Sequence, residues 1–401
     1  MILRLNELPL AGQRVLLRLD LNVPLSPDGT LRDDTRIREA LPTIQAICAA
    51  GGIPIVLSHL GRPKGQHTPG LSLAPVARHL ATLLDRVVHF SPDCIGERAR
   101  RTIADARTGE VVVLENLRFH PGEEANDPEF AAQLAHGCQV YVNDAFGAAH
   151  RAHASVVAIT EYVRWKGMGL LMERELRALR RLITTAESPY VVLMGGAKVS
   201  DKVAVLRALL PRCDALLIGG GMCFTFLRAQ GVAVGSSLVE EAMLPVAQEL
   251  VDHARRLGKR LLLPVDICAV QELTPEARCR YFRSEEGIPE GWIGVDIGPE
   301  SIELFAAELR QARTIFWNGP MGIYELEPFR AGTRGMARAV AEATRWGAFT
   351  VVGGGDSVAA VTQLGFSDAV GHLSTGGGAA LEFLAGMQLP GLAALEVAGQ
   401  S

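Results

Sequence analysis

Short apolar runs alternate with amphipathic helical patterns from one end of the chain to the other. Strand-like runs are RVLLRLDLNVP, IPIVLSHLG, VVVLENLRF and CQVYVNDAF in the first half, and YVVLMGG, ALLIGGG, RLLLPVDI, RTIFWNGP and FTVVGGG in the second. Between them lie helical stretches such as DTRIREALPTIQAICAAG and EEAMLPVAQELVDHARRLG. Strict alternation of this kind predicts an α/β fold with parallel sheets wrapped by helices. Ligands of such sheets bind at the carboxyl ends of the strands, where the polar and glycine residues of this chain lie.

One long amphipathic stretch divides this pattern in two. In residues 168–188 apolar side chains fall at helical spacing, with charged residues between them. Ser188-Pro189 then restarts the strand pattern. The length of 401 residues allows two or more domains, so we expect one domain on each side of a partly exposed connecting helix.

The composition indicates a reducing compartment and argues against a membrane protein, a secreted protein and a disulfide-linked or zinc-binding one. The longest apolar runs are strand-sized, well short of the ~20 residues of a membrane helix. Polar residues Asn6 and Glu7 interrupt the N-terminus too early for a signal peptide. The seven cysteines are scattered and form no CxxC pair, which indicates core residues in a reducing compartment and not disulfides or zinc ligands. We therefore expect a cytoplasmic protein without a membrane partner.

The charge is nearly balanced, so any anion site must be built locally. The net charge is −4, and residues 1–165 carry 17 Lys and Arg against 18 Asp and Glu. This balance argues against a nucleic-acid partner. Of those 17 cations only Lys64 is a lysine, and arginine is the better residue for bidentate contacts to phosphate and carboxylate.

Two glycine runs follow strands near the end of the chain, in FTVVGGGDSVAAV and VGHLSTGGGAALEFL. Glycine lets the backbone approach a ligand closely, and a helix that starts after it points free N–H groups at an anion. For either turn alone, a plain strand-to-helix turn is an equally good interpretation. Asp356 favours a phosphate site, because a carboxylate beside phosphates requires a bridging cation such as Mg²⁺.

Arginine and histidine recur after the strands of the first half. Taken singly, each of these residues and its polar neighbours could have a structural role, in a turn, as a core histidine or in an ion pair. Taken together, they suggest a basic pocket for a small anion. The residues are Asp20, Asn22, Arg36, His59, Leu60, Gly61, Arg62, Arg118 and Arg151.

The second half offers lysines and further glycines after strands. Lys198 and Lys202 would share one face if their segment is helical, and an anion between them would relieve their repulsion. Two solvated lysines are an equally good interpretation. Gly319 and Glu325 follow the strand RTIFWN, where Glu325 would accept hydrogen bonds from a ribose or cap a helix. An anion pocket facing a phosphate cradle suggests phosphoryl transfer.

These strings closely resemble the phosphoglycerate kinase family. The match runs in order through RLDLNVP, SHLGRPKG, LENLRFHPGEE, NDAFGAAHRAHAS, GLLMEREL, GGAKVSDK, IGGGMCFTF, GWIGVDIGPESIELF, FWNGPMGIYE, VVGGGDS and HLSTGGGAALEFLAG. The resemblance implies reversible, Mg²⁺-dependent transfer between ATP and 3-phosphoglycerate, giving ADP and 1,3-bisphosphoglycerate. It also implies a monomer of two doubly wound, Rossmann-like domains. The expected boundaries are 1–170, a connecting helix 171–188, 189–384, and a tail 385–401 that returns to the first domain.

The resemblance also implies a role for each candidate residue. The nine first-half residues named above would bind 3-phosphoglycerate. The nucleotide would be bound by Lys202, Gly319, Glu325, Gly354, Gly355, Asp356 and Ser357, with Asp356 as the metal ligand. Arg36 and Lys198 would hold the phosphoryl group in flight, assisted by the amides of Gly376, Gly377 and Gly378. Hinge closure would bring the two domains together.

The sequence offers no candidate catalytic aspartate in a kinase-type loop, and the implied reaction does not need a general base. A carboxylate acceptor is already ionised at neutral pH, since such groups titrate near ~4, so no general base is needed. Three positions depart from the family pattern: Ser357 and Ala148 stand where threonine is usual, and YVRWK at 162–166 is unusual before the connecting helix.

Two alternatives remain for comparison. An NAD-dependent oxidoreductase would need GxGxxG in the first turn, which reads DLNVP instead. A catalytically silent relative would be expected to lose transfer residues, yet Arg36, Lys198, Lys202 and Asp356 are all present.

Overall fold

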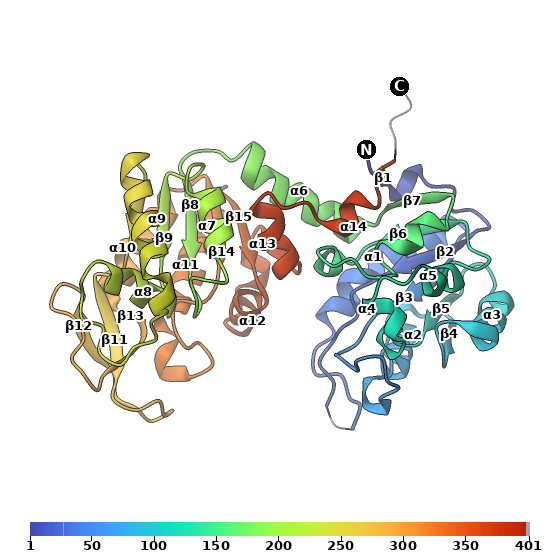
Figure 1. Cartoon of the computed structure of the whole chain (residues 1–401), viewed down its shortest axis with the longest axis horizontal. Helices are drawn as coiled ribbons and strands as arrows, with labels where there is room; N and C mark the ends of the chain where they lie inside the picture. The colour runs from blue at the N-terminus through green and yellow to red at the C-terminus, as the bar shows by residue number, and fades with distance from the viewer. Residues whose placement is uncertain (27, 398–401) are drawn as a thin grey trace. The chain divides into compact units, whose positions relative to one another are not determined.

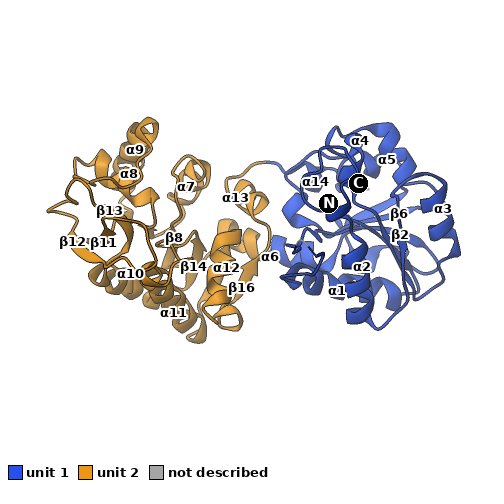
Figure 2. Ribbon diagram, turned by 90° about the horizontal axis from the view of Figure 1, so that it is seen from below, with its two compact units in different colours: residues 1–177, 388–401 blue, residues 178–387 orange. Residues whose placement is uncertain are grey.

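The chain forms two compact units in a computed structural model that describes residues 1–26 and 28–397. Unit 1 comprises residues 1–177 together with the segment from residue 388 onward, and unit 2 comprises residues 178–387 (Figure 2). Within the described ranges, no helix is both long and apolar enough to cross a membrane.

Unit 1 is built on a seven-stranded sheet in the order β1-β7-β6-β2-β3-β5-β4, in which every neighbouring pair is parallel. The strands are short, and the central ones are buried on both faces, which explains their continuous apolar sequences. Their bounds are β1 Leu3–Arg4, β2 Arg14–Arg18, β3 Ile53–Leu57, β4 Val88–Ser91, β5 Val111–Leu114, β6 Val140–Asn143 and β7 Trp165–Met168.

Helices surround this sheet (Figure 1). Apolar side chains of the first two helices pack against Val15, Leu17, Val56 and Val113 of the strands, forming one buried cluster. The helices are α1 Thr35–Ala49, α2 Ala74–Leu84, α3 Gly96–Asp105, α4 Pro121–Glu124, α5 Pro128–Leu134 and α14 Pro390–Ala393, with a 3₁₀ turn η3 at Leu117–Phe119.

Unit 2 repeats the scheme with a six-stranded parallel sheet in the order β10-β9-β8-β14-β15-β16. The strands are β8 Tyr190–Met194, β9 Ala215–Ile218, β10 Arg260–Leu262, β14 Thr314–Asn318, β15 Phe349–Gly353 and β16 His372–Ser374. The helices are α7 Val203–Leu209, α8 Met222–Ala229, α9 Leu244–Arg256, α10 Pro299–Gln311, α11 Ala331–Arg345, α12 Gly355–Gln363 and α13 Gly378–Leu384.

A second, antiparallel sheet departs from the strict parallel pattern expected from the sequence. Its order is β12-β11-β13, with bounds β11 Asp266–Val270, β12 Arg280–Arg283 and β13 Ile293–Ile297. The run RLLLPVDI, expected to be one strand, is divided between β10 and β11 at Pro264, whose ring removes a ladder donor.

Helix α6, Leu170–Thr184, starts in unit 1 and ends in unit 2. Its first turn is fixed within unit 1 by Asp144, whose Oδ1 accepts a hydrogen bond from Met172 N at 2.9 Å. Arg174, one turn further along, forms an ion pair with Glu39.

The last described residues of the chain lie in unit 1, beside its beginning. Gly391 N donates to Ala149 O at 2.8 Å, and Val397 N donates to Met1 O at 2.9 Å. Ile2 and Glu396 form an antiparallel bridge. Residues 398–401 of the expected tail lie outside the described residues.

Candidate active site

The end of β2 places Asp20 opposite the first turn of α1. Asp20 Oδ2 pairs with Arg36 Nη1, and Asp20 Oδ1 accepts a hydrogen bond from Asn22 N at 3.3 Å. Burial raises the pKa of the Asp20 carboxyl, but the positive charge of Arg36 and of its other neighbours brings that pKa below its usual value. The pair is therefore ionised and presents a fixed guanidinium at the carboxyl edge of the sheet.

Hydrogen bonds tie together the loops that follow β2, β3 and β5. Gly61 N donates to Asn22 Oδ1 at 2.9 Å, and Arg118 Nη1 donates to Gly61 O at 2.7 Å. Asn116 accepts from Leu60 N at 3.1 Å and donates to Leu60 O at 2.7 Å. Residues far apart in sequence are thus held in one network with fixed geometry.

The same network concentrates positive charge. Buried His59 lies 3.1 Å from Arg18 Nη2 through its Nδ1. Burial and the charge of Arg18 hold the pKa of His59 well below its usual value, so the ring is neutral at pH 7. Burial also lowers the pKa of Arg118, with further lowering from Arg18 and Arg151. Glu124 at 3.4 Å offsets part of this charge. The excess of positive charge favours a bound anion.

The two remaining predicted arginines lie at the surface. Arg62 is exposed, one residue beyond Gly61, and Arg151 is exposed with its Nε bonded to His150 Nε2 at 3.2 Å. Both side chains are accessible to a ligand, whereas Arg118 is already fixed within the network.

Three buried residues of this region were not singled out by the sequence. Arg18 Nε donates to Ser155 Oγ at 2.9 Å, and Ser155 Oγ donates in turn to Glu123 Oε1 at 2.6 Å. This chain holds the Arg18 guanidinium beside His59 without a directly paired carboxylate. The sequence did contain one indication of Arg18: it is a charged residue inside the otherwise apolar run VLLRL. A strand buried on both faces tolerates such a residue only when hydrogen-bond partners surround it.

In unit 2, the ends of β8 and β14 approach closely through glycines. Gly195 N donates to Asn318 O at 2.8 Å, and Gly196 N donates to Pro320 O at 2.8 Å. Gly319 has φ +92°, and a Cβ there would lie 2.2 Å from Gly195 O. Only glycine fits this crossing, which brings the two loops into one backbone cradle.

Lys202 lies at this cradle, and its Nζ donates to Asn318 Oδ1. Asn318 Nδ2 donates to Gly353 O at 2.7 Å, which links the lysine to the end of β15. Burial lowers the pKa of Lys202 to about 8, while the negative charge of Asp356 opposes that shift. A half-buried ammonium with no carboxylate paired to it is suited to receive phosphate oxygens.

The expected helical face shared by Lys198 and Lys202 is not formed. Residues 195–202 form an irregular loop of bends and turns, Lys202 is the N-cap residue of α7, and Lys198 is exposed. Glu240 holds this loop out of a helix, because its carboxylate accepts from Val199 N and from Ser200 Oγ, each at 2.5 Å.

Helix α12 begins directly at the first glycine run. Gly354 has φ +93°, Gly355 starts the helix, and Asp356 is exposed in its first turn. The Oγ of buried Ser357 accepts a hydrogen bond from Gly319 N at 2.6 Å. The hydroxyl therefore joins the start of α12 to the β14 turn, which serine provides as well as threonine would.

A cavity of about 400 Å³ adjoins this cradle. Glycines and apolar side chains line most of it, and three carboxylates reach it from Asp296, Glu325 and Asp356. A Cβ on Gly294 would lie 2.2 Å from the Phe224 ring, so glycine is required for the ring to lie against that wall. A mostly apolar cavity with few polar groups is typical of a small-molecule site.

The second glycine run starts α13 but is separate from the cavity lining. Gly377 has φ +53°, Gly378 is the first residue of α13, and Gly376 N is bonded to Ser374 Oγ at 3.3 Å. None of these three glycines is among the described residues that line the 400 Å³ cavity.

Comparison with known proteins shows likeness over nearly the whole chain. The model of the family described as phosphoglycerate kinase matches residues 5–387. The phosphoglycerate kinase of Acidobacterium capsulatum is 51% identical over 400 residues, covering 98% of each chain. That of Thermosipho africanus is 49% identical over 393 residues, covering 98% of this chain and 97% of its own.

Solved structures agree with this likeness. The phosphoglycerate kinase of Coxiella burnetii has a TM-score of 0.88 at 39% identity, covering 98% of this chain and 99% of its own. The enzyme of Pyrococcus horikoshii has a TM-score of 0.85 at 34% identity, covering 98% of both chains.

These likenesses and the two parallel α/β sheets define the chain as a phosphotransferase. More narrowly, it belongs to the phosphoglycerate kinase family. The resemblance, the fold class and the enzyme class predicted from the sequence are thereby confirmed.

Proposed function

We propose that the chain catalyses reversible transfer of a phosphoryl group between ATP and the carboxylate of 3-phosphoglycerate, giving ADP and 1,3-bisphosphoglycerate. The observation that carries this proposal is half-buried Lys202, with its lowered pKa, at a glycine cradle beside an apolar cavity. Membership of the family supports the choice of reaction.

Unit 1 supplies the acid-binding side. Arg36, fixed by Asp20, and Arg118, fixed by Gly61, provide cations whose positions do not depend on the ligand. Exposed Arg62 and Arg151 close on the ligand's phosphate from the surface. Neutral His59 donates or accepts a hydrogen bond without adding charge.

Unit 2 supplies the nucleotide-binding side. The cavity receives the base and ribose, with Glu325 accepting from the ribose hydroxyls, while the amides of Gly354 and Gly355 and the Lys202 ammonium meet the phosphates. Exposed Asp356 at the start of α12 offers carboxylate oxygens of the kind that Mg²⁺ prefers. The ion, when bound, neutralises phosphate charge.

Transfer in this proposal depends on positioning and charge, not on a base. The acceptor carboxylate is already ionised at pH 7, since such groups titrate near ~4. Arg36 and Lys198 spread the charge that develops on the phosphoryl group, assisted by the amides of Gly376, Gly377 and Gly378. Reacting atoms must come within about 3–3.5 Å, so the ligands of residues 1–170 and 189–384 meet by bending about segment 171–188.

Two further parts of the proposal concern the state of the protein. We propose that it acts as a monomer, because each ligand is bound by residues of one chain. We propose a cytoplasmic location, which agrees with seven free cysteines, six of them buried.

Turnover of the purified protein tests the reaction. ATP and 3-phosphoglycerate are supplied with Mg²⁺, and the product is reduced by glyceraldehyde-3-phosphate dehydrogenase, so that NADH loss reports the rate. We expect activity that disappears without Mg²⁺ and falls steeply in Lys198→Ala. Lys259→Ala is the matched control, because this half-buried lysine lies away from the cavity lining, and it should retain the wild-type rate. Absence of turnover with bound ATP would show that unit 1 serves another acid.

A further inference from the structure

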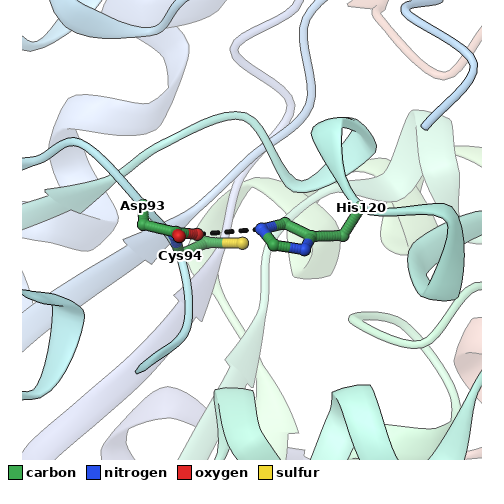
Figure 3. Close-up of side chains that lie close together, drawn as sticks. All are labelled: Asp93, Cys94 and His120. Carbon is green, nitrogen blue, oxygen red and sulfur yellow. Dashed lines mark hydrogen bonds and ion pairs between the residues drawn. The ribbon is translucent and has the colours of Figure 1, made fainter. Parts of the chain in front are cut away.

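A cysteine, a histidine and an aspartate meet outside the residues assigned to catalysis. Asp93 and Cys94 follow edge strand β4, and His120, the N-cap residue of α4, follows the neighbouring parallel strand β5. One ligand atom from each, the Asp93 carboxylate oxygen, Cys94 Sγ and a His120 ring nitrogen, lies within 4.8 Å of the other two (Figure 3). We propose that this Asp93–Cys94–His120 cluster binds a thiophilic divalent cation, Zn²⁺.

The types of ligand in the cluster indicate which class of metal ion it would bind. One thiolate, one imidazole and one carboxylate are the ligand types of a zinc site with three protein ligands and an open fourth position. Mg²⁺ and Ca²⁺ prefer oxygen ligands throughout, so a cysteine–histidine pair disfavours them. The site therefore differs in chemistry from the carboxylate proposed for Mg²⁺ in unit 2.

The present geometry is close to what an ion requires. His120 Nε2 and Asp93 Oδ1 are 2.8 Å apart in a hydrogen bond. Two such ligands on one tetrahedral zinc are roughly 3.3 Å apart, with bonds of about 2.0–2.2 Å. The pair needs to open by about half an ångström. The sulfur of Cys94 lies within 4.8 Å of both atoms (Figure 3) and needs to approach each to roughly 3.5 Å.

Neighbouring groups fix the ligands in place. Asp93 Oδ1 also accepts from Cys94 N at 2.7 Å and from Ile95 N at 3.4 Å, which orients the carboxylate. The His120 ring packs on Phe130 with centroids 5.3 Å apart. Support of this kind is characteristic of metal ligands.

Access and charge also suit an incoming cation. The side chains of His120 and Asp93 are 29% and 42% exposed, while Cys94 is buried behind them. Zn²⁺ would enter from the solvent side, and the thiol proton would leave to solvent as the zinc–sulfur bond forms. Burial raises the pKa of the Cys94 thiol well above its usual value, and the negative charges of Asp93, Glu123 and Glu115 raise it further. A cation bound beside the sulfur would offset those negative charges.

Cobalt spectroscopy tests the site directly. Purified protein, stripped with chelator and free of Mg²⁺ and nucleotide, is titrated with Co²⁺ alone, and the thiolate-to-cobalt charge-transfer band is recorded. Zn²⁺ content is then measured after dialysis against Zn²⁺. We expect one Zn²⁺ per chain and a band that Zn²⁺ abolishes by displacement. Cys94→Ala and His120→Asn should each remove the band and weaken Zn²⁺ binding at least about tenfold.

Two control variants separate the cluster from general effects. His89→Asn breaks a similar histidine–carboxylate pair, His89 with Glu110 at 2.8 Å, and Cys138→Ala removes another buried thiol of unit 1. Both should keep the band and the Zn²⁺ content. A wild-type protein without the band overturns the proposal, as does a band lost in Cys138→Ala but kept in Cys94→Ala. The wild-type result alone decides if Cys94→Ala fails to fold.

Discussion

Replacing Lys202 by methionine should stabilise the free protein at pH 7 while weakening nucleotide binding. Burial lowers the pKa of Lys202 from 10.5 to about 8, which means that the fold disfavours the charged ammonium. At 1.36 kcal/mol per pKa unit, the charged form costs about 3–4 kcal/mol at most. Methionine removes this cost but leaves the Oδ1 of Asn318 without its donor, so we expect a net gain of about 1–2 kcal/mol in the free energy of unfolding.

The pH dependence identifies the ammonium as the cause. Between pH 8 and pH 10.5 the unfolded chain keeps the Lys202 proton and the folded chain has lost it, so wild-type stability rises with pH. The advantage of Lys202→Met should therefore shrink by about 2 kcal/mol between pH 7 and pH 9.5. Urea unfolding of both proteins at the two pH values measures it. An advantage that stays constant with pH would refute the reasoning.

Nucleotide binding should offset the free-energy cost of keeping the Lys202 ammonium charged in the folded protein. Phosphates beside Nζ favour the ammonium, so binding Mg-ADP at pH 8.5 should take up about three quarters of a proton. Calorimetry in two buffers with different ionisation enthalpies counts that proton. Lys202→Met should bind more weakly and lose the uptake; equal uptake in the variant would assign the proton to another group.

Five further substitutions test other parts of the structure. Gly319→Ala should cost unit 2 more than about 3 kcal/mol in thermal unfolding, because its Cβ meets Gly195 O, whereas Gly347→Ala, also at φ +92° but in open space, should cost only about 1–2 kcal/mol. Burial raises the pKa of Asp144 to about 6, so the folded chain binds the proton more tightly than the unfolded chain between pH 3.8 and 6. Wild-type stability should fall by up to about 3 kcal/mol relative to Asp144→Asn as pH rises through that window; parallel unfolding curves would contradict this. Asp356→Asn should weaken Mg-nucleotide binding, measured by calorimetry, with 3-phosphoglycerate binding near normal. Arg36→Ala should reduce turnover far more than ATP affinity, and equal losses would contradict its assignment to the acid-binding side.

Parallel sheets were predictable because their strands are buried on both faces and read as unbroken apolar runs. The antiparallel sheet was not, since β12, RYFR, buries only Phe282 and leaves its other three side chains exposed. An amino-acid pattern with one buried position in four does not distinguish an edge strand from a loop. Pro264 was the local sign that RLLLPVDI could not continue as one strand.

The sequence names the residues of the candidate site as a prediction, but their geometry could not be predicted from it. The sequence placed Asp20 and Arg36 in one pocket, yet it did not indicate that Arg18 lies buried beside His59. That contact depends on which strands are neighbours in the sheet. Similarly, the spacing of Lys198 and Lys202 fitted a helix, and only the contacts from Glu240, some 40 residues later in sequence, show why a loop forms instead.

The bond between Val397 and Met1 has a consequence for how the chain is made. Unit 2 is an uninterrupted stretch, so its sheet is complete as soon as residue 387 has left the ribosome. Unit 1 must wait, because residues 388–397 are synthesised only after all of unit 2. The unit that begins first therefore finishes last, and its β1 edge stays without the contacts of the final segment throughout most of translation.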